Sequence, residues 1–457
     1  TPVSPANPAF GSYDSRRFAG PEGAAMMPTV TPRSRNPRSG SPWRRPMVAA
    51  IGIAVIFCSL PVSADLHTVT ELTDGNDGTC DAHCTLREAI AAANTGPDVD
   101  FIVLPEGTLL LTDPDGPLHI YTSVFLSGQG QEVTIVDASG LGHRAFDISA
   151  AGITVAFTSF TITGGSPTDS GGAIMAWAGT VSLSDIGLRD NTTQGAGGGI
   201  ASGTAQLTVK DGSVITRNHA PSFGGGGISG NDVAIIDSVI SQNSAGEGGG
   251  VSNAGTLTIS GSTIAYNSDH GFDGGGIAFF GTAADISNTT IVGNTSTRRG
   301  GAVYASGPLS LNGVTIHGNL SPTSSDLYAN NATITVTNTL IAGDCTTEAS
   351  GSFLSNGGNL ESPGDTCGLT AVLDLIAVDD PMVWPLNNFG GSTTTMLPRS
   401  GSPAVGAGSN VYCLPEDQRG VLRSDGACDV GAVERLIMEN DPVFADGFEI
   451  GTTGSWQ

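Results

Sequence analysis

The chain has 457 residues and is acidic, with 43 Asp and Glu against 18 Lys and Arg and a formal net charge of −25. This charge excludes nucleic acid and anionic membranes as partners, because both are themselves negative. Charged residues make up only 13% of the sequence and glycine occurs 66 times. The Gly-rich part has no 3.6-residue periodicity, which excludes helical repeats.

Residues 1–43 are rich in Pro, Ser and Arg, so we predict a disordered segment or one that precedes the true start of the protein. Residues 44–64 have the pattern of a secretory signal peptide: the pair Arg44–Arg45, an apolar core, and small residues up to a cleavage site after Ala64. A membrane anchor is the alternative. The apolar core is too short to cross a bilayer comfortably, so we expect no transmembrane span in the mature chain.

Six cysteines follow the signal peptide and fall into three local pairs, which suits disulfides formed in an oxidising compartment. A zinc site is the alternative, but the spacings match no familiar finger and no histidines are interleaved. The predicted disulfide cysteines are Cys80, Cys84, Cys345, Cys367, Cys413 and Cys428.

Residues 65–98 are predicted to form an N-terminal cap. Thr85 and Glu88 make a capping-box pattern, and the apolar residues that follow lie on one face of a short helix. Such a helix would cover the open end of a β structure, whose strand edges would otherwise be unpaired.

Residues 99–395 are predicted to form the main domain, because one short pattern recurs within them. An apolar residue and two variable positions precede an asparagine, and the asparagines are 27, 25, 24, 27 and 25 residues apart. A period of this length indicates stacked units, and a propeller blade of roughly 40 residues is too long for it. The repeat therefore predicts an all-β fold, a single-stranded right-handed parallel β-helix in which each coil depends on its neighbours for a core.

One asparagine per coil places amide above amide, so these side chains are expected to form a hydrogen-bonded ladder along the axis. This structural role is favoured over a catalytic one. The predicted rungs are Asn191, Asn218, Asn243, Asn267, Asn294, Asn319 and, as the seventh, Asp344.

Asp185 and Asp237 occupy the same place in their coils, roughly 10 Å apart at the usual strand spacing, near the upper limit for the carboxylate pair of an inverting glycosidase. In seven coils, however, this position holds only Asp, Gly or Asn, the residues that tolerate positive φ. A turn explains all seven positions and a catalytic pair explains two. We therefore predict no catalytic residues.

Just before the ladder, four consecutive coils present polar or aromatic side chains, which we interpret as a glycan-binding strip: Asp190, Arg217, Gln242 and Tyr266. The basic residues Lys210 and Arg298–Arg299 have no Asp cluster in register, so a lyase site is not predicted. Phosphate-binding and transition-metal motifs are absent from the sequence, which predicts no cofactor, and a role for calcium has no supporting motif.

Residues 396–435 are predicted to be an irregular C-terminal closure tied by Cys413 and Cys428, and residues 436–457 a separate tail.

The stretch Cys84–Ala89 is similar to the CSLREA motif of secreted bacterial right-handed parallel β-helix proteins, with Thr85 in place of Ser. Residues 401–434 resemble the C-terminal region of choice-of-anchor β-helix proteins, and the coils resemble repeats of polymorphic outer membrane proteins. The resemblance implies a secreted or cell-surface protein, with a Gram-negative bacterium as its source. We expect adhesion or glycan binding without catalysis, with carbohydrate or host-cell surface components as partners. The alternatives are a polysaccharide lyase or glycoside hydrolase on the same fold, and a passive structural spacer.

Overall fold

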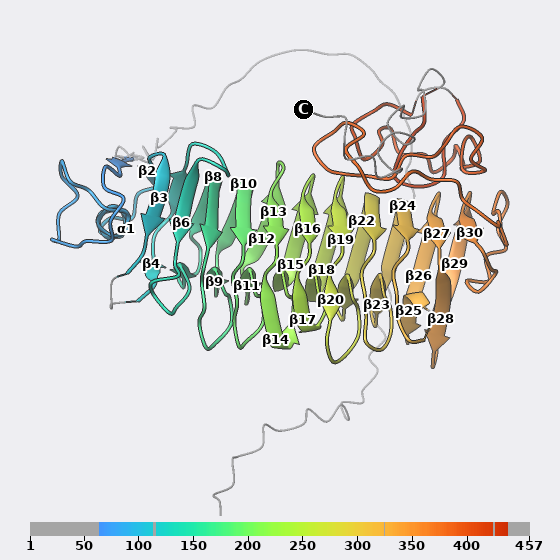
Figure 1. The fold of residues 1–457 in the computed structure, drawn as a ribbon, viewed down its shortest axis with the longest axis horizontal. Helices are drawn as coiled ribbons and strands as arrows, with labels where there is room; N and C mark the ends of the chain where they lie inside the picture. The colour runs from blue at the N-terminus through green and yellow to red at the C-terminus, as the bar shows by residue number, and fades with distance from the viewer. Residues whose placement is uncertain (1–63, 113–115, 324, 424–425, 437–457) are drawn as a thin grey trace, which may run out of the picture. The chain divides into compact units, whose positions relative to one another are not determined.

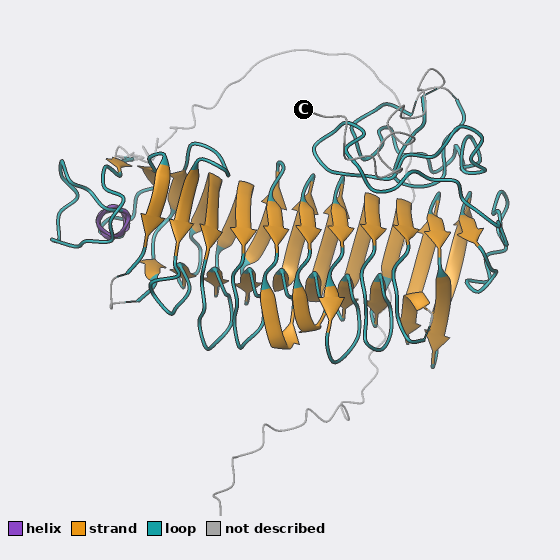
Figure 2. Ribbon diagram, viewed as in Figure 1, coloured by secondary structure: helices purple, strands orange, loops and turns teal. Residues whose placement is uncertain are grey.

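The structure is a computed structural model that describes residues 64–112, 116–323, 325–423 and 426–436. The predicted disordered segment, signal peptide and C-terminal tail lie outside these residues, apart from Ala64 and Leu436. The described part contains 30 strands and one helix, and the strands of successive coils pair side by side along one stack (Figures 1 and 2).

The coils present three faces, and strands of successive coils pair in parallel on each of them. The first face contains β1 (Leu66–Thr68), β2 (Asp100–Val103), β3 (Gly107–Leu110), β5 (Val124–Ser127), β6 (Thr134–Asp137), β8 (Thr154–Thr163), β10 (Thr180–Arg189), β12 (Gln206–Lys210), β13 (Val214–Thr216), most of β15 (Ile228–Ile236), β16 (Val239–Ser241), most of β18 (Val251–Ser260), β19 (Thr263–Ala265), β22 (Ala283–Val292), β24 (Leu309–His317), β26 (Thr333–Thr337), β27 (Leu340–Ala342), β29 (Ser352–Gly357) and β30 (Leu360–Ser362).

The second face lies across the coil from the first and is built from short strands: β4 (Leu118–Ile120), β7 (Phe146–Ile148), β9 (Ile174–Ala176), β11 (Ile200–Ser202), the first residues of β15 and β18, β21 (Ile277–Phe279), β23 (Val303–Ala305), β25 (Ser325–Asn330) and β28 (Asp344–Glu348). The third face is a separate three-stranded sheet of β14 (His219–Gly224), β17 (Ser244–Glu247) and β20 (Ser268–Asp269). The predicted fold class, a single-stranded right-handed parallel β-helix with a capped N-terminal end, is confirmed.

In-register residues from successive coils form the core. One column runs through every coil of the regular repeat without exposed surface: Leu188, Ile215, Ile240, Ile264, Ile291, Ile316 and Ile341. Each branched side chain covers the one in the preceding coil, so apolar surface is buried only in the stack.

The predicted turn position bends the first face in each coil. All seven of its residues have positive φ, namely Asp185, Gly212, Asp237, Gly261, Asn288, Gly313 and Asn338. The restriction to Asp, Gly and Asn at this position therefore has a backbone cause, because these residues tolerate the left-handed region best.

The asparagines form a continuous hydrogen-bonded column. From Asn191 to Asn294, each side-chain amide donates to the carbonyl oxygen of the asparagine in the next coil, at N···O distances of 2.9–3.0 Å. The same carbonyl oxygen also accepts the backbone N–H of the preceding asparagine, as in the bond from Asn218 to Asn243 at 2.9 Å. The column therefore satisfies buried backbone groups as well as its own amides.

The column ends on Asp326, not on the predicted Asp344. Asn319 donates to Asp326 Oδ2 at 3.5 Å, seven residues along the chain, and Asp344 lies in β28, where its backbone pairs with Ser325. The coil after Asn319 lacks the glycine cluster, so its chain enters β25 early and brings Asp326 under Gly343, where a Cβ would meet the carboxylate at 2.2 Å.

The predicted capping helix is α1 (Leu86–Ala93). Thr85 Oγ1 accepts the N–H of Glu88 at 3.3 Å, and Glu88 Oε2 accepts the N–H of Thr85 at 2.9 Å, which completes the capping box. Arg87 holds the preceding loop through Asp74 at 2.8 Å. Leu86 and Ile90 are buried in the end of the solenoid core, so the helix closes the stack as expected.

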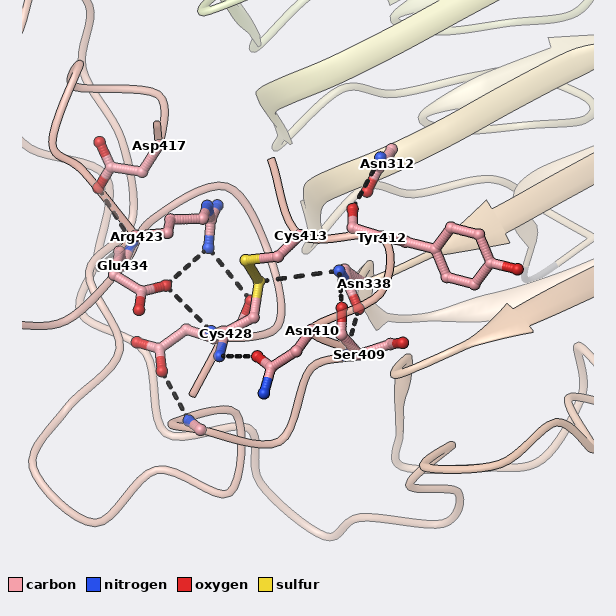
Figure 3. The surroundings of a disulfide bond; sticks show 12 residues. Asn312, Asn338, Ser409, Asn410, Tyr412, Cys413, Asp417, Arg423, Cys428 and Glu434 are labelled. Atoms are coloured by element: carbon pink, nitrogen blue, oxygen red, sulfur yellow. Dashed lines mark hydrogen bonds and ion pairs between the residues drawn. A yellow bond between two sulfur atoms is a disulfide. The ribbon is translucent and has the colours of Figure 1, made fainter. Parts of the chain in front are cut away.

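Residues 376–436, which we call the C-terminal lobe, fold back along the later coils (Figure 1). Val383, Met396 and Val430 of the lobe pack against apolar residues of β19, β22, β27 and β30. Around the Cys413–Cys428 disulfide, Ser409 exchanges two hydrogen bonds with Asn338 of the solenoid, and Arg423 pairs with Glu434 at 2.9 Å (Figure 3). The other two predicted disulfides, Cys80–Cys84 and Cys345–Cys367, are also present.

Replacing Cys413 and Cys428 together with serine is expected to destabilise the lobe by about 3 kcal/mol, because a loop of about 15 residues loses its covalent constraint. Hydrogen exchange measured by mass spectrometry should show faster exchange in residues 396–436 and unchanged exchange in β10 to β16. A Cys80→Ser/Cys84→Ser variant serves as the control and should leave the lobe unchanged. Equal acceleration along the whole stack would contradict the expectation.

Candidate functional site

A row of residues with left-handed backbone marks the corner just before the asparagine column. Asp190, Arg217, Gln242 and Tyr266 have φ values of 57, 54, 55 and 55°, and glycine takes this corner in the next two coils, Gly293 and Gly318. Glycine adopts this conformation freely, whereas a bulky residue pays a conformational free-energy cost of roughly 1–3 kcal/mol. Arg217, Gln242 and Tyr266 therefore stand at a backbone conformation that glycine would adopt with less strain.

All four residues of the predicted strip are exposed. Arg217 makes two bonds of 2.7 Å to the carboxylate of Asp190 in the preceding coil. These bonds raise the pKa of Arg217, so this arginine is a fixed cation and cannot act as a base. The Tyr266 ring, 53% exposed, lies over Gly293, where a Cβ would be 2.6 Å from the ring.

The strands β13 and β16 separate this row from the turn row, by which we mean the positive-φ turn positions from Asp185 to Asn338. The outward-pointing side chains of the two strands are small and uncharged: Val214, Val239 and Ser241 are partly exposed, and Thr216 is buried. The C-terminal lobe packs over the equivalent part of the following coils, where Thr393 Oγ1 donates to the carbonyl of Gly261 at 2.9 Å. Val214 and Val239 are partly exposed beside this edge, so the lobe forms a wall along one side of a shallow face.

Three aspartates lie at or next to the turn row: Asp185 and Asp237 occupy turn positions, and Asp211 directly precedes the turn residue Gly212. Their environments differ. Asp185 accepts a bond from Gln131 at 2.7 Å. Hydrogen bonds from Ser184 and Lys210 lower the pKa of Asp211 below its usual range. Burial, and then the neighbouring charge of Asp211, raise the pKa of Asp237. Neighbouring carboxyl groups whose pKa values are shifted in opposite directions are a known arrangement of acid–base sites. The sequence pattern pairs Asp185 with Asp237 and does not include Asp211.

A cavity of about 280 Å³ opens beside Asp237, where the turn row meets the C-terminal lobe. Solenoid and lobe supply opposite walls, and the lining residues are Ile236, Asp237, Ser260, Gly261, Asn288, Ser392, Glu416, Asp417, Gln418, Arg419 and Gly420. The sequence predicts only that the segment Asp417–Gly420 belongs to the C-terminal closure, residues 396–435. Its place in this wall could not be read from the sequence, because more than 150 residues separate it from Asp237.

A second charged cluster, around Arg299, lies on the other side of the asparagine column. Arg299 does have an acidic partner in register: Asp273, one coil earlier, at 3.1 Å, with Arg298 at 3.8 Å. Burial and the charge of Asp273 raise the pKa of the neighbouring Glu247. Aligning the coils on the residue before each glycine cluster, which gives Gly224, Glu247, Asp273 and Arg299, would have revealed this column.

The crystal structure of pectate lyase Pel9A aligns with a TM-score of 0.52 and 12% sequence identity, over 82% of this chain and 98% of that one. The fold resembles that of a pectate lyase. A second match, Geobacillus virus E2 ORF18, has a TM-score of 0.36 and 12% identity, over 65% of this chain and 62% of that one. No family model and no curated protein matches the sequence.

Within residues 64–436, apart from the short gaps, no group of three or more His, Cys, Asp or Glu side chains is arranged to hold a metal ion. The described helix is too short to cross a membrane.

Proposed function

We propose that this protein binds an extended, neutral polysaccharide on the outward face of β13 and β16, along the strip Asp190, Arg217, Gln242 and Tyr266. The observation that carries the proposal is the presence of three bulky side chains at a corner that glycine occupies in later coils. The strip offers one side chain per coil at intervals of about 4.8 Å, and it supplies a guanidinium group, an amide and one phenol ring. Such groups bind sugar hydroxyls and sugar ring faces.

A neutral polymer fits the charges better than an acidic one. The chain has a net charge of −25, and the arginine of the strip is already paired with Asp190. An acidic polysaccharide would be repelled by the protein as a whole and would have to break this pair. Neutral hydroxyl groups need only hydrogen bonds.

We further propose that the protein works outside the cytoplasm, as a secreted or surface-held adhesin-like protein that needs no cofactor. Three disulfides support an oxidising compartment. The CSLREA-like stretch around α1 and the choice-of-anchor-like lobe support membership of the corresponding group of exported bacterial β-helix proteins.

Polysaccharide cleavage is the second candidate. Pectate lyase Pel9A shares the fold, and Asp211 and Asp237 form a carboxyl pair with opposite pKa shifts beside a cavity. Release of reducing or unsaturated ends from a polysaccharide panel would support this candidate, and polymer binding without release would support the first.

Replacing Arg217, Gln242 and Tyr266 together with glycine is expected to weaken polysaccharide binding at least tenfold, because the side chains are lost. Stability should stay equal or rise, since glycine relieves the left-handed strain of about 1 kcal/mol or more per position. Affinity electrophoresis against neutral and acidic polysaccharides, together with thermal denaturation, measures both effects.

The matched control is Ala349→Gly, which relieves the same backbone conformation at a remote exposed position, where φ is 59°. It should leave binding unchanged. Binding by the triple glycine variant at the wild-type level would refute the strip as the glycan site.

A further inference from the structure

The cavity between the solenoid and the C-terminal lobe has fixed walls. Gln418 of the lobe donates to the carbonyl of Ser262 and accepts from Thr290, at 3.1 and 2.6 Å. Asn288 donates to the carbonyl of Glu416 at 2.8 Å. These bonds join segments more than 120 residues apart, and Gln418 is buried, so the cavity is formed before any ligand arrives.

Asp237 is the carboxylate whose bonding is incomplete in this cavity. The other buried acid of the lining, Asp417, is held by Arg419 at 3.0 Å and by the N–H groups of Arg419 and Val421. In the described chain, by contrast, the side chain of Asp237 makes no hydrogen bond or ion pair, although it is only partly exposed. Burial without a donor raises its pKa. A half-buried carboxylate of this kind requires donors from a ligand or from water.

Gly261 places this carboxylate. A Cβ at Gly261 would lie 2.0 Å from Asp237 Oδ1, so only glycine leaves room for the carboxylate above the turn. Gly212 occupies the same turn one coil before Asp237, also with positive φ, and a Cβ there would meet nothing within 4 Å. The turn itself therefore demands glycine or a similar residue at both positions, but contact with the carboxylate adds a second demand at Gly261.

The volume and lining define the ligand. About 280 Å³ is at the lower end of ligand pockets and accommodates a single small ring rather than a length of polymer. Asp237 and Glu416 both line the cavity, so an anionic ligand is disfavoured and a ligand rich in hydroxyl donors is favoured. Asp237 and the cavity lie at one end of β16, and Gln242 of the strip lies at the other end. The cavity is therefore next to the face proposed to bind polysaccharide.

We infer that this cavity is a subsite for one neutral sugar unit, whose hydroxyl groups donate to the carboxylate of Asp237. The inference rests on the proposed function, since the sugar unit belongs to the polysaccharide held on the adjacent face. The lobe then has a role beyond closing the solenoid: it supplies the second wall of the subsite.

Asp237→Asn in the full chain is expected to weaken binding of a neutral oligosaccharide at least tenfold, because a charged acceptor is replaced by a neutral amide of the same shape. Asp185→Asn is its control, as an aspartate at the same turn position that accepts from Gln131 and lies outside the cavity lining. The probes are cello-, xylo-, manno- and malto-oligosaccharides of two to six units, measured by isothermal titration calorimetry.

Gly261→Ala and Gly212→Ala form a second matched pair. Both introduce a methyl group at positive φ, but only the first displaces the Asp237 carboxylate. Binding should fall at least tenfold in Gly261→Ala and change less than twofold in Gly212→Ala. If Gly261→Ala does not fold, the isosteric Asp237→Asn variant still decides the question.

The outcomes separate the two proposals. Wild-type binding that persists in Asp237→Asn overturns the subsite and leaves the strip in place. Equal losses in Asp185→Asn and Asp237→Asn also overturn it, because the effect would then not belong to the cavity. Absence of binding by the wild-type chain to every oligosaccharide and polysaccharide tested rejects both the subsite and the proposed function.

Discussion

Asn243→Ala is expected to lower the free energy of unfolding by roughly 3–6 kcal/mol. The Asn243 side chain accepts from the backbone N–H and the amide of Asn218, and donates to the carbonyl of Ile215 and to Asn267. Alanine leaves the buried backbone N–H and one side-chain amide hydrogen of Asn218 without their acceptor, each at about 1–3 kcal/mol, and it interrupts the column in the middle. Urea denaturation followed by circular dichroism measures the loss.

The control for this variant is the adjacent Gln242→Ala, at an exposed position outside the column. Apart from any change in backbone strain, this substitution is expected to change the free energy of unfolding by less than about 0.5 kcal/mol. Asn191→Ala gives a graded comparison, because Asn191 is the first asparagine of the hydrogen-bonded column and receives its bond from the N–H of Gly165. Similar small losses at Asn243 and Gln242 would show that the amide column contributes little to stability.

Asp326→Asn is expected to stabilise the protein above pH 7. Burial raises the pKa of Asp326 from 3.8 to about 7, with Asn319 opposing the shift and Asp344 adding to it. A raised carboxyl pKa means that the folded state binds the proton more tightly than the unfolded chain. The stability from this group is therefore complete below about pH 4 and is lost as the pH rises to about 7, by roughly 4 kcal/mol in all.

The neutral amide of Asp326→Asn removes this loss and can still accept the bond from Asn319. Unfolding measured at pH 4.5, 6 and 8 should show a variant that gains stability over the wild type as the pH rises. Asp285→Asn, at an exposed position on β22, is the control and should follow the wild type at all three values. A constant difference across this pH range would contradict the assigned titration.

The periodic sequence predicted the repeat well for a physical reason. Ile240, Asn243 and Gly248 recur because each coil must repeat the same packing, amide bond and backbone turn, so one pattern specifies many coils. Cap and disulfides also followed from local signals, such as Thr85 with Glu88 and the short spacing from Cys413 to Cys428.

What escaped prediction depends on contacts between distant segments or on a broken repeat. Asp326, and not Asp344, ends the column because the coil after Asn319 has no glycine cluster and enters β25 early. The cavity beside Asp237 needs Glu416 to Gly420, which no periodic comparison brings near it. Partners such as Asp273 for Arg299 were missed because the loops between asparagine and glycine cluster differ in length, which shifts a count made from the asparagine.

The way the lobe is fastened restricts how this protein can change length during evolution. Gln418, Thr393 and Ser409 bond to Ser262, Gly261 and Asn338, coils that span much of the later solenoid. Inserting or deleting one coil between these anchors would move them by about 4.8 Å relative to one another and break the match with the lobe. A coil gained or lost before Gly261 would leave that match intact. Relatives of different size should therefore differ in the N-terminal half of the stack, with the spacing of the anchored coils kept constant.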